Sequence, residues 1–270
     1  MPFTPSHAVV ALAFTRTPLV PAAIAVGAMA PDLPLFIRRV IPGYAITHDL
    51  VWLPATVVMA LALLLVWRCV LRPAVRELVP RSLAERIPAE WDRAPSVSFG
   101  ETFSRRGSAH PTWSGVLVLL LSLAIGVISH IVWDSFTHEG CEGVAILPVL
   151  DAQWGPLLGF KWLQYGSGVV GLVVIGVWAL VRVRSVPPTR IDNSVLPSVV
   201  RVVWWISLPL VLVIAWVAGL WALGPLDGNF TVAHLGYRVL PPACAVWAAL
   251  TVVLCLAVVW MRRARHSAGS

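Results

Sequence analysis

Five long apolar stretches, separated by short polar connections, run along the chain. They cover approximately residues 50–71, 115–138, 165–184, 200–223 and 238–261. Each is close to the ~20 residues that an α-helix needs to cross the hydrocarbon core of a bilayer. Helices are the structure that single runs of this length form in lipid, because a helix satisfies all its backbone hydrogen bonds internally. The pattern therefore predicts an all-α fold, a polytopic membrane helical bundle with five spans.

The N-terminal segment, residues 1–34, is also apolar but less regular. It allows three interpretations: one span, a hairpin of two short helices broken at the sequence TRTP, or a signal peptide cleaved after an Ala-x-Ala triplet. A signal peptide is disfavoured, because the segment starts without Lys or Arg, Arg16 interrupts the apolar run and a proline would follow the cut. We expect the hairpin, whose antiparallel halves would return the chain to its starting level and bring His7 close to Asp32.

The composition agrees with a membrane location. Hydrophobic residues make up 58% of the chain, charged residues 12%, and the mean hydropathy is +0.82, whereas soluble domains carry roughly 25% charged residues. The charged residues do not gather into a segment large enough to fold as a separate soluble domain. We expect a single integral membrane domain over residues 1–264, with residues 72–114 as a cytoplasmic polar segment and residues 265–270 as a tail.

The basic residues predict the orientation, because Lys and Arg are retained preferentially on the cytoplasmic side of a membrane. Arginines concentrate in residues 72–114, around the linker at 185–199 and in the C-terminal tail. We therefore expect these segments inside and the connections 139–164 and 224–237 outside. The net charge of +7 is then a topology signal. Since the arginines are spread over three segments, we expect no nucleic-acid partner.

The second long apolar stretch ends in SHIVWDSFTH, which places His130, Asp134 and His138 four residues apart. On a helix these side chains lie along one face, because a four-residue step overshoots a full turn by only about 40°. An aspartate at the bilayer centre costs ~2.5–3.5 kcal/mol on insertion scales, so it usually faces a partner or a cavity. A divalent metal is a suitable partner. The alternative is a hydrogen-bonded polar network that fixes helix packing.

Three further polar residues are expected at the same face of the membrane. His7 precedes the first short helix, Asp32 follows the second, and His48 comes just before the 50–71 span. Together with the helical motif they would form a funnel from the outer interface into the bundle. We predict a divalent metal, with zinc as the leading candidate. The expected ligands are His7, Asp32, His48, His130, Asp134 and His138.

These motifs together resemble a known family. The opening MPFTPSHAVVA, then GAMAPDLP, THDL and SHIVWDSFTH resemble a bacterial membrane family catalogued as domain of unknown function 4184, over essentially the whole membrane domain. The resemblance implies a multi-pass protein of the bacterial inner membrane without an assigned activity. More distantly, the chain is similar to inner-membrane proteins predicted to be metal-dependent hydrolases and to zinc-dependent phospholipase C. The latter similarity implies the same six ligands. The sequence lacks the downstream His-x3-Glu of the phospholipase C group. We therefore expect one or two metals and not three.

If the site is catalytic, metal-assisted hydrolysis is the chemistry that it would support. A divalent metal lowers the pKa of bound water to ~7 and polarises a phosphoryl or acyl oxygen. A carboxylate that does not bind the metal would accept the water proton. A site open to the outer leaflet suits a phospholipid or another amphipathic substrate that enters sideways, so we expect membrane lipid as the partner. The candidate proton acceptors are Asp49, Glu139 and Glu142, although each is more commonly a plain interfacial charge.

Two other classes of function stay open. An ion- or proton-coupled transporter would use the same buried residues as a relay, but the sequence shows no internal repeat and no paired broken helices. A non-catalytic membrane scaffold would need the polar cluster only for packing. The sequence leaves the substrate, the number of metals and the oligomeric state open.

Overall fold

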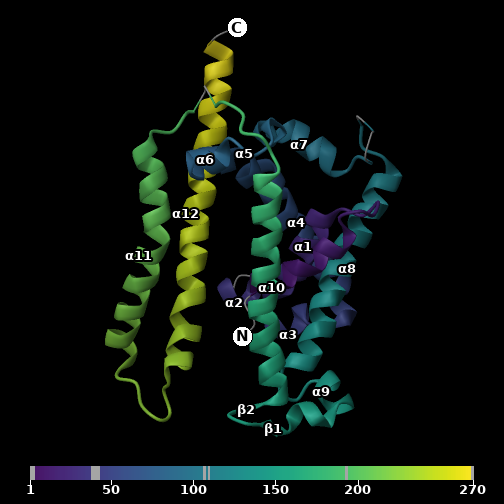
Figure 1. Ribbon diagram of the computed structural model, residues 1–270, viewed down its shortest axis with the longest axis vertical. Helices are drawn as coiled ribbons and strands as arrows, with labels where there is room; N and C mark the ends of the chain where they lie inside the picture. Colours follow the sequence, from purple (N-terminus) through teal and green to yellow (C-terminus); the bar gives the residue numbers. More distant parts are fainter. Residues whose placement is uncertain (1–3, 38–42, 106–107, 109, 192–193, 269–270) are drawn as a thin grey trace. The chain divides into compact units, whose positions relative to one another are not determined.

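The computed structural model of this protein is built almost entirely of helices (Figure 1). It describes all residues except 1–3, 38–42, 106–107, 109, 192–193 and 269–270. Among the described residues, five helical stretches are long and apolar enough to cross a membrane. They coincide with the five predicted spans, so the all-α, multi-pass membrane fold is confirmed. The stretches are Leu50–Leu78, Trp113–Thr137, Gly159–Arg184, Ser198–Leu223 and Val232–Arg265.

The chain divides into two compact units, which are described separately. The first consists of Met1–Leu33, Pro42–Val66 and Phe99–Ser185. The second consists of Pro34–Ile41, Trp67–Ser98 and Val186–Ser270. The expectation of a single membrane domain over residues 1–264 stays a prediction.

The first unit begins with the predicted N-terminal hairpin. The 3₁₀ helix η1, Thr4–Phe14, turns back into the helix α1, Pro21–Met29. A proline at the first position of α1 is favourable there, because the first N–H groups of a helix have no partner within the helix. The short helix η2, Ala30–Asp32, continues from α1. Asp32 is therefore the last residue of a short helix that directly follows the second arm of the hairpin.

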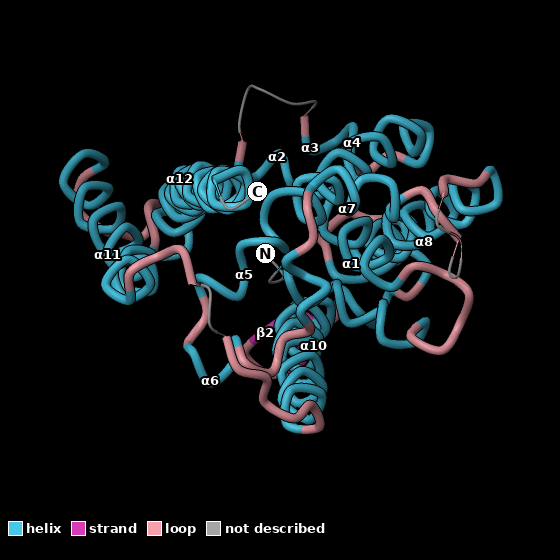
Figure 2. Tube along the Cα trace, turned by 90° about the horizontal axis from the view of Figure 1, so that it is seen from above, coloured by secondary structure: helices cyan, strands magenta, loops and turns pink. Residues whose placement is uncertain are grey.

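Helix α1 packs closely against α8, Trp113–Thr137, and the two lie side by side in Figure 2. A Cβ atom on Gly27 would collide with the carbonyl oxygen of Leu123, and a Cβ atom on Gly126 would collide with that of Ile24. Glycine at both positions therefore lets the two backbones touch, as small residues do between membrane helices.

The remaining elements of this unit connect and cover the long helices. His48 and Asp49 follow the one-turn helix α3, Tyr44–Thr47, and lead into η3, Leu50–Trp52, and α4, Leu53–Val66. After α8, a short irregular region precedes the long helix α10. The irregular region consists of α9 (Glu142–Ile146), η6 (Pro148–Asp151) and the antiparallel strands β1 (Gln153–Trp154) and β2 (Leu157–Leu158). Helix α10 spans Gly159–Arg184.

The second unit is built around two long helices that form an antiparallel pair (Figure 1). Tryptophans join them: Trp204 donates to Thr251 Oγ1 at 3.1 Å and Trp247 donates to Ser207 Oγ at 2.9 Å. Short helices pack at one end of the pair, around a core that includes Leu78. The elements are α2 (Leu33–Phe36), the π-helix η4 (Trp67–Leu71), α5 (Arg72–Leu78), α6 (Arg81–Ala84), η5 (Ala89–Asp92), α11 (Ser198–Leu223) and α12 (Val232–Ala268), while α7 (Pro95–Thr102) runs from this unit into the first.

Candidate metal centre

Four side chains of the first unit form a group that is able to hold a metal ion: Asp32, His48, His130 and Asp134. Each offers one ligand atom, and these atoms all lie within 4.8 Å of one another. The two aspartates and His130 are buried, and His48 is half-buried. We call these four residues the metal group.

Short elements bring these residues together. Asp32 ends η2, which extends α1, and His48 is the residue that follows α3. His130 and Asp134 come from α8. As the four-residue spacing predicts, the last two share one face of the helix, with His130 Nε2 3.4 Å from Asp134 Oδ2.

Hydrogen bonds to carbonyl oxygens fix the same tautomer in both histidines of the metal group. Nδ1 of His130 lies 2.7 Å from the carbonyl oxygen of Ala28, and Nδ1 of His48 lies 3.0 Å from that of Tyr44. A carbonyl oxygen can only accept, so each Nδ1 carries the proton and donates it. In the neutral rings each Nε2 therefore presents a lone pair, and the two Nε2 atoms face each other at 3.1 Å.

Acceptor atoms thus converge without a donor between them. Asp134 Oδ2 lies 3.7 Å from His48 Nε2, in addition to its approach to His130. Among the residues that the structure describes, neither carboxylate oxygen of Asp134 has a hydrogen-bond partner, and neither does Nε2 of His7. A buried polar atom without a partner costs roughly 1–3 kcal/mol. A cation bound among these atoms would remove that cost.

The charge of the metal group matches a divalent ion. Two buried carboxylates give it −2 when the imidazoles are neutral; one shared proton would leave −1, whereas a divalent ion balances both. Asp32 Oδ1 lies 3.8 Å from His48 Nε2 and 3.7 Å from His130 Nε2. Two ligands of a tetrahedral zinc ion lie about 3.3 Å apart, close to the measured separations. The residues present therefore fit a divalent metal with nitrogen and oxygen ligands.

The 3₁₀ geometry of η1 places two of its residues beside the metal group. Side chains at positions i and i+3 of a 3₁₀ helix are eclipsed, so Thr4 and His7 face the same way. Thr4 Oγ1 donates to Asp32 Oδ2 at 2.6 Å, which leaves Oδ1 of Asp32 for the metal group. His7 Nε2 lies 3.5 Å from Asp134 Oδ1.

Neutral groups outside the ligand set orient the ligands, a role that sequence reasoning did not assign. Besides Thr4 and the Ala28 carbonyl, the ring of Tyr44 stacks on His48 with centroids 3.7 Å apart. Thr47 Oγ1 donates to the carbonyl oxygen of Pro31 at 2.7 Å and so ties α3 to η2. Such contacts usually set ligand orientation and affinity. The available signal was the position of Thr4 and Thr47 inside the same motifs as His7 and His48.

His138, predicted as a ligand, lies at the edge of the metal group with both ring nitrogens engaged. Its Nδ1 is 3.6 Å from Asp134 Oδ2 but also 3.2 Å from the backbone oxygen of Asp134. Its Nε2 is 3.0 Å from Nε2 of Gln164, a residue that is only 1% exposed. The ligand roles of His7 and His138 stay predictions, since the metal group consists of the other four candidates.

The three predicted proton acceptors, Asp49, Glu139 and Glu142, are all exposed. Asp49 Oδ1 accepts the backbone N–H of Val51 at 2.9 Å and thereby caps η3. No hydrogen bond or ion pair between described residues joins any of the three to the metal group. Their catalytic role stays a prediction, and the structure supplies no contact in its favour.

Cys141 lies just beyond the end of α8, outside the candidate spans. Burial raises the pKa of its thiol, and the negative charges of Asp134 and Glu142 raise it further. Because the thiolate is the form that binds metals, the protonated thiol is a poor ligand at neutral pH. This agrees with the sequence, in which the cysteines show no metal-binding spacing.

A cleft of about 520 Å³ lies between η1, α8 and α10. Clefts of this size, ~300–1,000 Å³, are typical of small-molecule sites. The lining is mostly apolar, and His7 belongs to it. His7 therefore lies both beside Asp134 and on the wall of the cleft. The other lining residues are Ser6, Val9, Val10, Ser129, Val132, Trp133, Ser167, Val170 and Gly171.

The sequence profile of a family described as a domain of unknown function (DUF4184) matches residues 1–260, so the chain belongs to this family. No curated protein and no solved structure matches the chain.

Proposed function

We propose, for this member of a family of unknown function, a membrane-embedded metal-dependent hydrolase that acts on an amphipathic, phospholipid-like substrate. The observation that carries the proposal is the pair of Nε2 atoms of His48 and His130, 3.1 Å apart, beside an Asp134 carboxylate without a hydrogen-bond donor among the described residues. With Asp32 they would hold one divalent metal, for which we propose zinc.

When bound, the metal supplies an activated water and neutralises charge that develops on a phosphoryl or acyl oxygen. The chain's own residues position the ligands and handle the proton. Thr4 and the Ala28 carbonyl hold Asp32 and His130 in the ligating orientation. His7 lines the cleft, and its Nε2 has no hydrogen-bond partner among the described residues. We assign it to accept the proton released by the attacking water.

The cleft supports the amphipathic substrate. Valines from η1, α8 and α10 offer an apolar wall along which an acyl chain can lie, and His7 marks the place of the scissile ester. A transporter or a scaffold would also account for the buried polar residues. A cleft lined by His7, whose Nε2 lies 3.5 Å from Asp134 Oδ1, favours a bound substrate over a packing role. We place the protein in the bacterial inner membrane, in agreement with its five spans and basic segments.

Metal analysis and a lipid-hydrolysis assay on the purified protein test the proposal. We expect stoichiometric divalent metal and release of a soluble or lysolipid product from phosphatidylglycerol or phosphatidylethanolamine in mixed micelles, followed by mass spectrometry. His7→Gln should keep the metal and lose at least about 100-fold in turnover, since proton transfer contributes ~10²–10⁴-fold. Asp151→Asn, an exposed change, is the control and should keep both.

A wild-type protein without stoichiometric metal would exclude the metalloenzyme. Metal without hydrolysis of any lipid or phosphoester would leave the transporter and scaffold as explanations. If His7→Gln releases the metal, then His7 is a ligand and the proton acceptor must be sought among Asp49, Glu139 and Glu142.

A further inference from the structure

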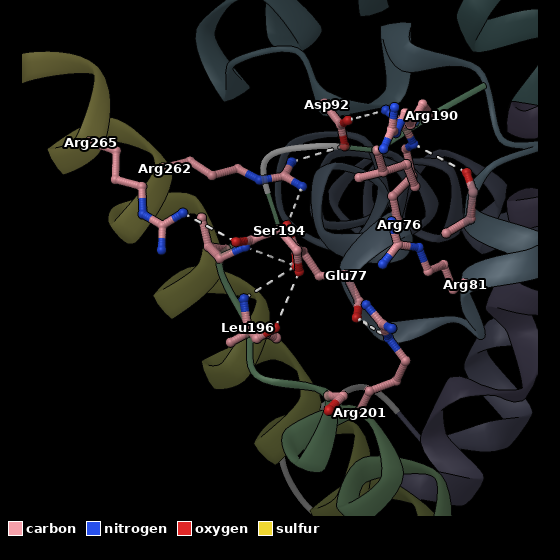
Figure 3. A pocket seen from close by; sticks show the side chains of 14 residues that line it. Arg76, Glu77, Arg81, Asp92, Arg190, Ser194, Leu196, Arg201, Arg262 and Arg265 are labelled. Carbon is pink, nitrogen blue, oxygen red and sulfur yellow. Dashed lines mark hydrogen bonds and ion pairs between the residues drawn. The ribbon is translucent and has the colours of Figure 1, made fainter. Parts of the chain in front are cut away.

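The second unit contains a cavity of about 750 Å³ that the proposed function does not use (Figure 3). It is lined from α5, from the linker before α11, and from the facing ends of α11 and α12. The lining is strongly basic. It includes Arg76, Arg81, Arg190, Arg201, Arg262 and Arg265, against the two carboxylates of Glu77 and Asp92.

The two carboxylates are fully engaged by the protein itself. Glu77, 2% exposed, accepts from Arg262 Nη2 at 2.9 Å and from Ser194 Oγ at 2.7 Å. Asp92 accepts from Arg262 Nη1 at 2.9 Å and from Arg76. The ion pairs join α5, η5 and α12, and the hydrogen bond from Ser194 ties the linker to α5. They also balance the charges of Arg76 and Arg262.

Arg201 and Arg265 are not balanced in this way. Arg201 Nε donates to the backbone oxygen of Glu77 at 2.8 Å, and Arg265 Nη1 donates to that of Ser194 at 3.1 Å. Both acceptors are neutral carbonyls. No carboxylate among the described residues forms an ion pair with either guanidinium. Arg81 is paired as well, with Glu85 Oε1 at 3.2 Å from its Nε, so the proposal rests on the charges of Arg201 and Arg265.

We propose that this cavity binds a phosphate-bearing anion through Arg201 and Arg265. A guanidinium presents two parallel N–H donors that match phosphate oxygens. Within the described part of the chain, each of these two side chains uses one nitrogen on a carbonyl oxygen, which leaves other N–H groups to bind a ligand. The cavity volume suits a head group or a small phosphorylated metabolite. This proposal is independent of the hydrolase.

The place of the cavity along the spans indicates two sources for the phosphate. The residues that line the cavity lie at the C-terminal ends of the candidate spans Leu50–Leu78 and Val232–Arg265 and at the N-terminal end of α11. The arginine-rich ends are expected on the cytoplasmic side, and basic pockets between helices on that side bind anionic lipid head groups. A soluble phosphate compound would present the same group from the cytoplasm.

Binding of defined probes distinguishes the sources. The purified protein in neutral detergent is titrated with dihexanoyl phosphatidylglycerol, with dihexanoyl phosphatidylcholine and with inorganic pyrophosphate, and binding is followed by tryptophan fluorescence and by the midpoint of thermal unfolding. We expect phosphatidylglycerol, pyrophosphate or both to bind and to raise the midpoint, and phosphatidylcholine to do neither. Binding of the lipid alone assigns the site to a head group. Binding of pyrophosphate alone assigns it to a soluble ligand.

Charge-neutral variants test the residues. Arg201→Gln with Arg265→Gln should raise the dissociation constant about 25-fold, since one surface arginine contributes about fivefold to binding of an anionic group. The matched control, Arg182→Gln with Arg184→Gln at the end of α10, removes the same charge outside the cavity and should bind normally. Arg265→Gln alone, which gives up a single bond to a carbonyl, should show about a fivefold loss if the double variant does not fold. The proposal would be overturned if neither phosphatidylglycerol nor pyrophosphate binds, or if the folded Arg265→Gln variant binds with unchanged affinity.

Discussion

Replacing Asp134 by Asn is expected to abolish metal binding while the protein still folds. The side chain is 6% exposed, and its Oδ2 lies within 3.7 Å of ring nitrogens of His48, His130 and His138. Asparagine preserves the shape of aspartate but removes the charge that offsets a divalent cation. An uncharged amide is also easier to bury than a carboxylate without a partner.

The magnitude follows from comparing the metal-bound and metal-free states. A metal present at about 100 times its dissociation constant stabilises the folded state by ~2.7 kcal/mol, and chelation should remove that stabilisation from the wild type. The metal-free wild type keeps a carboxylate whose two buried oxygens have no donor in the described part of the chain, at a cost of roughly 1–3 kcal/mol for each. The Asn variant avoids much of this cost, because its amide can donate to a facing Nε2 lone pair. Without metal, the variant should therefore be more stable than the wild type.

The assay combines metal content by mass spectrometry with thermal unfolding in detergent, with and without chelator. At ~2–4 °C per kcal/mol for a chain of this size, chelation should lower the wild-type midpoint by about 5–10 °C and leave the Asn variant unchanged. Asp151→Asn should behave as the wild type does. If Asp134→Asn retains wild-type metal, or if chelation leaves the wild type unaffected, the helical motif is structural and the metal assignment is wrong.

Three further predictions concern packing, ligand orientation and topology. Gly126→Ala should destabilise the protein by ~1–3 kcal/mol and release metal, because its Cβ meets the backbone of α1. In unfolding assays the control Gly166→Ala, whose Cβ meets nothing within 4 Å, should be neutral or stabilising. Thr4→Val should weaken metal binding about 10–100-fold by freeing Asp32, and Thr4→Ser should restore it; equal affinity in both would deny the role of this hydrogen bond. Reporter fusions after residues 100 and 266 should report the cytoplasmic side, and a fusion after residue 150 should report the outside. A cytoplasmic signal from the fusion after residue 150 would contradict the assigned topology.

Much of the fold could be predicted because lipid leaves few alternatives. A run of about 20 apolar residues has only the helix available, and all five spans follow from that. The N-terminal hairpin was predictable from the TRTP break. Helical periodicity alone predicted that His130 and Asp134 share one face, since both lie on one regular helix.

What depends on contacts between distant segments could not be read from the sequence. The basic cavity joins residues from Arg76 to Arg265, and in the sequence the same arginines indicate only which side of the membrane they face. Asp49 was a candidate proton acceptor because it is a carboxylate outside the predicted ligand set. An aspartate directly before a helix is also a typical N-cap, and the structure places it in that role. The engagement of His138 by Gln164 depends on where α10 packs against the end of α8, which no local pattern specifies.

The glycine contact between α1 and α8 connects the packing of the first unit to its chemistry. Because Gly27 and Gly126 let the two backbones touch, the carbonyl oxygen of Ala28 comes within 2.7 Å of His130 Nδ1. That hydrogen bond places the proton on Nδ1 and turns the Nε2 lone pair toward Asp134. A side chain at either glycine would separate the helices and remove the acceptor, so His130 would no longer be held in the ligating tautomer. The ligands themselves would all still be present. Loss of metal in Gly126→Ala with the helical content intact would therefore show that this contact, and not only the identity of the ligands, determines the metal centre.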